Sequence, residues 1–87
     1  MKNITVTEVF SPGCHVCRMF EEYWESIKND WPNVALNRLD VTTPEGQEAI
    51  GKYQIFASPG IIINDELWAT GGFDKKKLVD TLKKLSE

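Results

Sequence analysis

The chain has 87 residues, of which 41% are hydrophobic and 26% are charged, and its formal net charge is −3. This length predicts a single domain over residues 1–87, because a second domain would be too short to bury a core of its own. The acidic balance argues against nucleic-acid binding, which needs a concentrated basic face, and no apolar run approaches the length of a membrane span. We expect a monomer that binds neither nucleic acid nor a membrane.

The N-terminal segment does not have the form of an export signal. Residues 1–3 lead directly into Ile4–Thr7, where polar residues interrupt the apolar ones. We therefore expect a cytoplasmic protein. In that compartment thiols are kept reduced, so a cysteine pair is more often redox-active or metal-binding than structural.

The first half of the chain predicts a strand, a helix and a second strand. Ile4–Phe10 is rich in β-branched residues and ends at a Ser-Pro-Gly turn, which is typical of a strand. Apolar residues then recur at spacings of three and four and predict a helix that ends before Pro32 (Val16, Met19, Phe20, Tyr23, Trp24, Ile27 and Trp31). Alternation in Val34–Val41 predicts the second strand.

The second half begins with a short helix that Thr42 or Thr43 caps. Pro44 lies near its first turn, and Glu45 is placed for a capping box. Apolar residues at helical spacing continue it through Tyr53 (Ala49, Ile50 and Tyr53).

A hairpin and a last helix complete the predicted order. Gly60–Ile63 and Leu67–Thr70 flank the polar turn formed by residues 64–66, and Asp74 caps a final helix. The order strand–helix–strand–helix–strand–strand–helix predicts an α/β fold. Helices are expected on both faces of one mixed sheet of four strands.

Cys14 and Cys17 form a Cys-x-x-Cys motif after the first strand and turn, where the first helix begins. Unsatisfied backbone N–H groups and the positive end of the helix dipole stabilise a thiolate at this position. The spacing also lets the second sulfur meet the first across one helical turn. A free thiol with a pKa of about 8.5 is mostly protonated at neutral pH, so a lowered pKa raises its reactivity. The motif therefore predicts a redox-active pair.

Three alternatives to a redox role stay open for this pair. A structural disulfide would close a loop of about four residues and contribute only ~2 kcal/mol in the chain-entropy model. A zinc site needs four ligands, and the only further candidate is His15, which is poorly placed beside Cys14. Two inert core cysteines are the third alternative. We expect His15 to be an exposed residue of the first turn that tunes the chemistry of Cys14 without performing it.

At this point the sequence resembles a known family. The strand, turn, Cys-x-x-Cys motif and helix, followed by Leu36–Asp40 (LNRLD), resemble the first half of a thioredoxin. Ala49–Ile55, Phe56–Gly60 (FASPG) and three isoleucines are very similar to the thioredoxin segment that leads to its cis-proline. The resemblance covers nearly the whole chain, and it implies a thioredoxin-like three-layer α/β/α sandwich.

The resemblance also implies a substrate site. In thioredoxins the proline lies against the active-site cysteines, and the backbone beside it pairs with the substrate strand. It therefore implies that the Ser58–Pro59 bond is cis and that both residues shape the docking site. We expect Gly13, beside Cys14, to contribute to this site and Gly60 to leave room for a substrate chain.

Further features resemble glutaredoxins. The chain is short, and Gly71–Asp74 resembles the Gly-Gly-x-Asp segment where glutaredoxins hold glutathione. This makes Gly72 an expected substrate contact. The usual tyrosine between the cysteines and valine before the proline are missing, since Val16 and Ser58 occupy those places.

Glu8 precedes Cys14 by the spacing at which thioredoxins place a buried acid that helps to deprotonate the second cysteine. An acid in an apolar strand is costly unless it is paired or protonated, and such residues are often functional. The alternative, a solvent-facing strand residue, stays open.

These features predict an enzyme, a protein-disulfide oxidoreductase, in which Cys14 attacks a substrate disulfide and Cys17 resolves the mixed disulfide. We expect protein disulfides and an upstream reductase as partners, with no cofactor and no metal. One alternative is a glutaredoxin-type reductase that uses glutathione. The other is a non-enzymatic carrier that holds a metal or an iron–sulfur cluster through Cys14.

Overall fold

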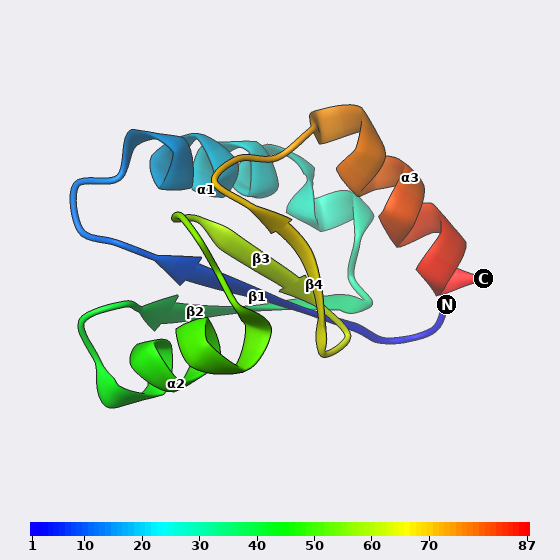
Figure 1. Ribbon diagram of the computed structural model, residues 1–87. Helices are drawn as coiled ribbons and strands as arrows, with labels where there is room; N and C mark the ends of the chain where they lie inside the picture. Colours follow the sequence, from blue (N-terminus) through cyan, green and yellow to red (C-terminus); the bar gives the residue numbers. More distant parts are fainter.

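The computed structural model describes residues 1–87 and contains one four-stranded mixed sheet with helices on both of its faces (Figure 1). The strands are β1 (Ile4–Phe10), β2 (Val34–Asp40), β3 (Gly60–Ile63) and β4 (Glu66–Thr70). The helices are α1 (His15–Ile27), α2 (Pro44–Tyr53) and α3 (Lys75–Ser86), with a 3₁₀ turn η1 (Lys28–Asp30) after α1. The predicted α/β class, the element order and the number of strands are confirmed.

The sheet has the strand order β2-β1-β3-β4. β1 pairs in parallel with β2 and antiparallel with β3, and β3 pairs antiparallel with β4. The parallel pair matches residue for residue along its full length, from Ile4 opposite Val34 to Phe10 opposite Asp40. This register places Glu8 directly opposite Arg38.

Two apolar clusters fill the spaces between the sheet and its helices. α1 and α3 cover one face, and α2 covers the other (Figure 1). The larger cluster joins alternate residues of β1 and β3 to both helices (Ile4, Val6, Phe20, Trp24, Trp31, Ile61, Ile63, Leu78 and Leu82). The smaller cluster joins Val9 and Ile62 to Ala49 of α2. None of the helices combines the length and apolar character that crossing a membrane requires.

The boundaries of α1 and β2 differ from the predicted ones. α1 ends at Ile27, and the 3₁₀ turn continues the chain, with the Trp31 N–H donating to the Lys28 carbonyl at 3.0 Å. The Trp31 side chain is only 8% exposed, so its place in the apolar pattern reflects burial and not helical continuation. β2 ends at Asp40, because the Asp40 carboxylate accepts the Thr42 N–H at 2.8 Å and starts a turn.

The predicted capping box of α2 is wrong. Thr43 is the N-cap, and its hydroxyl accepts the Gly46 N–H at 3.1 Å. Glu45 therefore occupies the second helical position, one residue short of the place from which a capping box closes. The predicted Asp74 cap of α3 is confirmed, since its carboxylate accepts the Lys77 N–H at 3.0 Å.

The hairpin turn is shorter than expected. β4 begins at Glu66, which leaves Asn64 and Asp65 as a two-residue turn with φ values of 50° and 66°. Two left-handed residues suit the right-handed twist of the adjoining strands, and Asn and Asp tolerate this conformation better than most residues.

Candidate active site

Cys14 lies at the end of the loop that connects β1 to α1. The chain leaves β1 at Phe10 and turns through Gly13, whose φ of 78° belongs to the left-handed region that glycine adopts without strain. The Cys14 N–H donates to the Ser11 carbonyl at 3.2 Å and closes this turn. Cys14 is then the N-cap of α1, at the helix start that the sequence predicts.

A disulfide joins Cys14 to Cys17, whose Cα atoms lie 5.3 Å apart. The two sulfurs have different surroundings, because Cys17 is 2% exposed whereas Cys14 is only partly buried. The Cys14 Sγ accepts the Cys17 N–H at 3.1 Å. This N–H and the positive end of the α1 dipole would stabilise a Cys14 thiolate after reduction.

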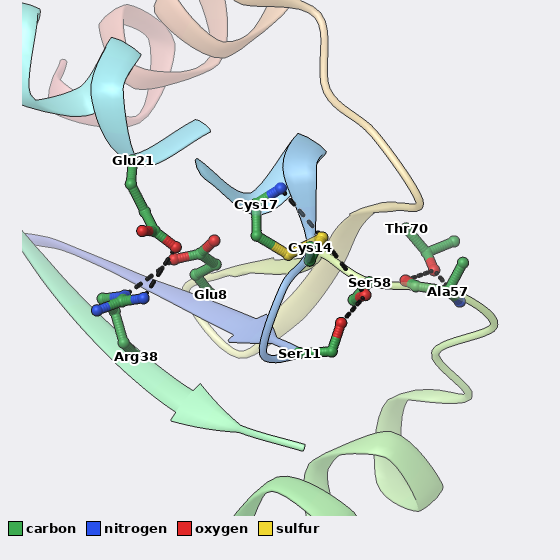
Figure 2. The surroundings of a disulfide bond; sticks show 9 residues. All are labelled: Glu8, Ser11, Cys14, Cys17, Glu21, Arg38, Ala57, Ser58 and Thr70. Atoms are coloured by element: carbon green, nitrogen blue, oxygen red, sulfur yellow. Dashed lines mark hydrogen bonds and ion pairs between the residues drawn. A yellow bond between two sulfur atoms is a disulfide. The ribbon is translucent and has the colours of Figure 1, made fainter. Parts of the chain in front are cut away.

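The loop before β3 lies against Cys14 (Figure 2). The Ser58–Pro59 bond is cis, the conformation that the resemblance implies. The Ser58 hydroxyl lies 3.6 Å from the Cys14 Sγ and 2.6 Å from the Ser11 hydroxyl. The structure therefore brings together the cysteines, Ser58 and Pro59, although Ser58 follows Cys14 by 44 residues in the chain.

Thr70, the last residue of β4, fixes this loop (Figure 2). Its hydroxyl oxygen accepts the N–H groups of Phe56 and Ala57 at 3.2 and 3.1 Å, and its proton is donated to the Ala57 carbonyl at 2.9 Å. The Gly71 N–H is shared between the carbonyls of Ala57 and Pro59 at 3.1 and 3.0 Å. Thr70 and Gly71 thus satisfy the N–H groups of Phe56 and Ala57 and the carbonyls of Ala57 and Pro59.

Replacing Thr70 by valine is expected to loosen the loop. The substitution keeps the shape of the side chain but removes three hydrogen bonds to Phe56 and Ala57, which should cost about 1 kcal/mol of unfolding free energy because these bonds are exposed. Denaturant unfolding measures this loss. Thr5→Val is the matched control, since the exposed Thr5 side chain makes no hydrogen bond. Equal stabilities of the two variants would contradict the bracing role.

Glu8 is buried, which decides between its two predicted environments. Alternation along β1 places it on the same face as Ile4 and Val6, beneath α1, and its side chain is 0% exposed. Figure 2 shows the carboxyl pointing toward the side of the sheet that carries Cys17 and Glu21. The Arg38 Nε donates to Glu8 Oε1 at 3.2 Å.

Burial is the largest of the effects that raise the pKa of Glu8 from 4.5 to about 8, and a hydrogen bond and like charge from Glu21 act in the same direction. The Arg38 guanidinium lowers the pKa, but it does not outweigh desolvation. Glu8 is therefore largely protonated at neutral pH, and its pKa lies close to that of an ordinary thiol.

The remaining predicted site residues have mixed outcomes. Gly13 lines a pocket of about 150 Å³ together with both cysteines. Gly60 is buried, and a Cβ at this position would lie 2.7 Å from the Ile55 side chain. The space that Gly60 leaves is taken by the protein's own Ile55, so the expectation that it leaves room for a substrate chain is wrong. His15 is exposed at the first position of α1, and Gly72 is partly buried after β4; their contributions stay predictions.

Sequence reasoning missed four residues of this site, namely Arg38, Glu21, Ser11 and Thr70. Arg38 could have been found from the register of two strands of equal length, which sets it opposite Glu8. Glu21 follows Cys17 by four residues, so both lie on the same side of α1. The contacts of Ser11 and Thr70 depend on how the loops fold, and no local pattern indicates them.

Comparison with known proteins agrees with this geometry. A family model described as the thioredoxin domain matches residues 3–83. The structure of Fasciola hepatica thioredoxin is 25% identical, with a TM-score of 0.73, and the match covers 94% of this chain and 80% of that one.

Two further structures of oxidised thioredoxins share the fold. Thioredoxin O2 from Arabidopsis thaliana has a TM-score of 0.76 at 21% identity, over 99% of this chain and 77% of that one. Mitochondrial thioredoxin 3 from Saccharomyces cerevisiae has a TM-score of 0.76 at 18% identity, over 98% of this chain and 81% of that one. Sequence comparison with curated proteins gives no significant match. Because the thioredoxin model matches nearly the full chain, and because the fold and the cysteine pair agree with it, the chain belongs to the thioredoxin-domain family.

Proposed function

We propose that this protein is a protein-disulfide reductase that exchanges its Cys14–Cys17 dithiol with substrate disulfides. The observation that carries the proposal is the unequal setting of the two sulfurs. Cys14 caps α1, accepts an N–H and is partly accessible, whereas Cys17 is 2% exposed. Cys14 is thus suited to attack an incoming disulfide, and Cys17 is suited to act only after a substrate is attached to Cys14.

The reaction consists of two exchanges. The Cys14 thiolate attacks one sulfur of the substrate disulfide, a mixed disulfide forms, and the other substrate sulfur leaves as a thiolate that takes up a proton. Cys17 then loses its proton and attacks the Cys14 Sγ, which releases the second substrate thiol. Two electrons have passed to the substrate, and the Cys14–Cys17 disulfide remains. An external reductant must restore the dithiol.

We assign to Glu8 the role of accepting the proton that the Cys17 thiol loses. A carboxyl with a pKa of about 8 matches a thiol closely enough to exchange a proton with it near neutral pH. This role agrees with the burial of Glu8 and Cys17 on the same face of the sheet.

Ser58 is the proposed docking point for the substrate backbone. Neither its N–H nor its carbonyl makes a hydrogen bond within the chain, although neighbouring Ala57 uses both groups. An extended substrate segment could pair with these free groups beside Cys14, as a strand added to a sheet edge does. Ser58 and Ser11 also line a largely apolar groove of about 310 Å³ that continues to Phe56, whose side chain is 88% exposed.

A comparison of reductants tests the proposal. We expect the oxidised protein to turn over a protein disulfide rapidly with a thioredoxin reductase or another protein reductant, and slowly with glutathione and glutathione reductase. Comparable rates in the two systems would favour a glutaredoxin-type function. A protein that is brown as purified and reduces no disulfide would favour the iron–sulfur carrier. We place the activity in the cytoplasm, where a reductase can keep the pair reduced.

A further inference from the structure

One arginine joins two carboxyl groups behind the cysteine pair. The Arg38 Nε donates to Glu8 Oε1 at 3.2 Å, and its Nη2 donates to Glu21 Oε2 at 2.9 Å (Figure 2). The guanidinium also lies 4.2 Å from the centre of the Phe10 ring, which supports it from one side. Glu8 and Glu21 are therefore held close together by a shared cation.

The surroundings of the second carboxyl oxygen of Glu8 favour the protonated form of this residue. Glu8 Oε2 is buried, and no N–H or hydroxyl group of the protein donates to it. An ionised carboxylate can only accept hydrogen bonds, so it would leave this oxygen unpaired at considerable cost. Protonation of Glu8 removes this charge, and Glu21, whose carboxylate is bonded to the same guanidinium as Glu8, is the group beside it that can take up the proton.

Glu21 is also the member of the cluster through which a proton can leave. Glu8 is 0% exposed, while the side chains of Glu21 and Arg38 are 29% and 45% exposed. Arg38 cannot serve as a carrier, because a guanidinium does not lose its proton in proteins. Arg18, Glu22 and Glu25 of α1 line a pocket with Glu21 and Arg38, Cys17 lines a second pocket with the same pair, and Ile61 of β3 lies opposite Glu8. Glu25 pairs with Lys28, and Glu21 is the solvent-accessible carboxylate that is bonded to the same arginine as Glu8.

We propose that Glu8 and Glu21 share a proton and that Glu21 is the relay residue through which the buried acid exchanges protons with solvent during the resolving step. Glu8 passes its proton to Glu21 and on to water, and the proton of the Cys17 thiol takes its place on Glu8. Cys17 becomes the attacking thiolate, and no electron moves along this path. Glu21 acts through Glu8 and does not touch the substrate. The inference rests on the function proposed above.

The shared proton is tested without any turnover, by NMR titration of the glutamate carboxyl carbons in the oxidised protein. In Glu21→Gln the hydrogen-bonding carboxylate and its like charge are gone, so the apparent pKa of Glu8 should fall by about one unit or more. Glu22→Gln removes a charge from the neighbouring exposed position and should leave Glu8 unchanged. A Glu8 titration that is the same in both variants would overturn the proposal.

The relay is tested by single-turnover kinetics of the second exchange. Glu21→Gln should slow the release of substrate from the mixed disulfide by at least about tenfold relative to Glu22→Gln, and it should leave the first exchange intact. Equal release rates, in a wild-type protein that does reduce disulfides, would overturn the relay while the proposed function stands. A wild-type protein that reduces none would overturn the proposed function instead, and the NMR titration would still decide whether the proton is shared.

Discussion

Replacing Cys17 by serine is expected to turn the protein into a trap for its substrates. Cys14 keeps its place at the N-cap of α1 and can still attack a disulfide, but no second thiol is present to resolve the product. Mixed disulfides through Cys14 should then accumulate. Non-reducing gels and peptide mapping of the linked species measure this outcome.

The matched control is Cys14→Ser. Its remaining thiol, Cys17, is 2% exposed and lies in the first turn of α1, so it should capture little or no substrate and disulfide reduction should fall to background. If this variant traps partners and Cys17→Ser does not, the two cysteines have the opposite roles.

The second large effect is on stability and concerns Glu8→Gln. The pKa of Glu8 is about 8 in the folded protein and 4.5 as a free side chain, so the folded state binds the proton more tightly. The stability that the neutral carboxyl provides is complete below pH 4.5 and is lost as the pH rises through about 8. Glutamine cannot ionise, so the variant should match the wild type at the acidic end. Above the folded pKa it should be more stable by an amount on the order of 5 kcal/mol.

Denaturant unfolding as a function of pH measures the difference. Glu22→Gln serves as the control, because this exposed carboxyl should show no comparable divergence from the wild type. Parallel stability curves for Glu8→Gln and the wild type would mean that Glu8 is not held in its neutral form.

Local patterns predict the fold where burial and turn chemistry agree. β1 and β3 begin and end at the expected residues, because runs of β-branched residues there meet turn residues at their ends. Trp31 shows where periodicity misleads, since it falls on the helical repeat but reaches the core from the end of a 3₁₀ turn. The sequence also does not distinguish Thr42 from Thr43 as the N-cap of α2, because both are good capping residues. The turn that begins at Asp40 places Thr43 at the capping position.

The site is predictable only in part. The Cys-x-x-Cys motif marks the helix start, and the spacing to Glu8 marks a candidate acid. Whether Glu8 is buried depends on which face α1 covers, and its pairing with Arg38 depends on strand register. The prediction for Gly60 failed because the Ile55 side chain comes to lie against Gly60 only in the folded chain, and no local pattern indicates this contact.

The proposed reaction requires that the two electrons a substrate receives come from Cys14 and Cys17. The most direct measurement mixes the fully reduced protein with a protein disulfide in the absence of any other reductant. Substrate thiols are then counted, and the oxidised peptides are mapped. We expect one Cys14–Cys17 disulfide to form for each substrate disulfide that is reduced. Substrate reduction that leaves the cysteine pair reduced, or a reduced pair that transfers nothing to the substrate, would contradict this reaction.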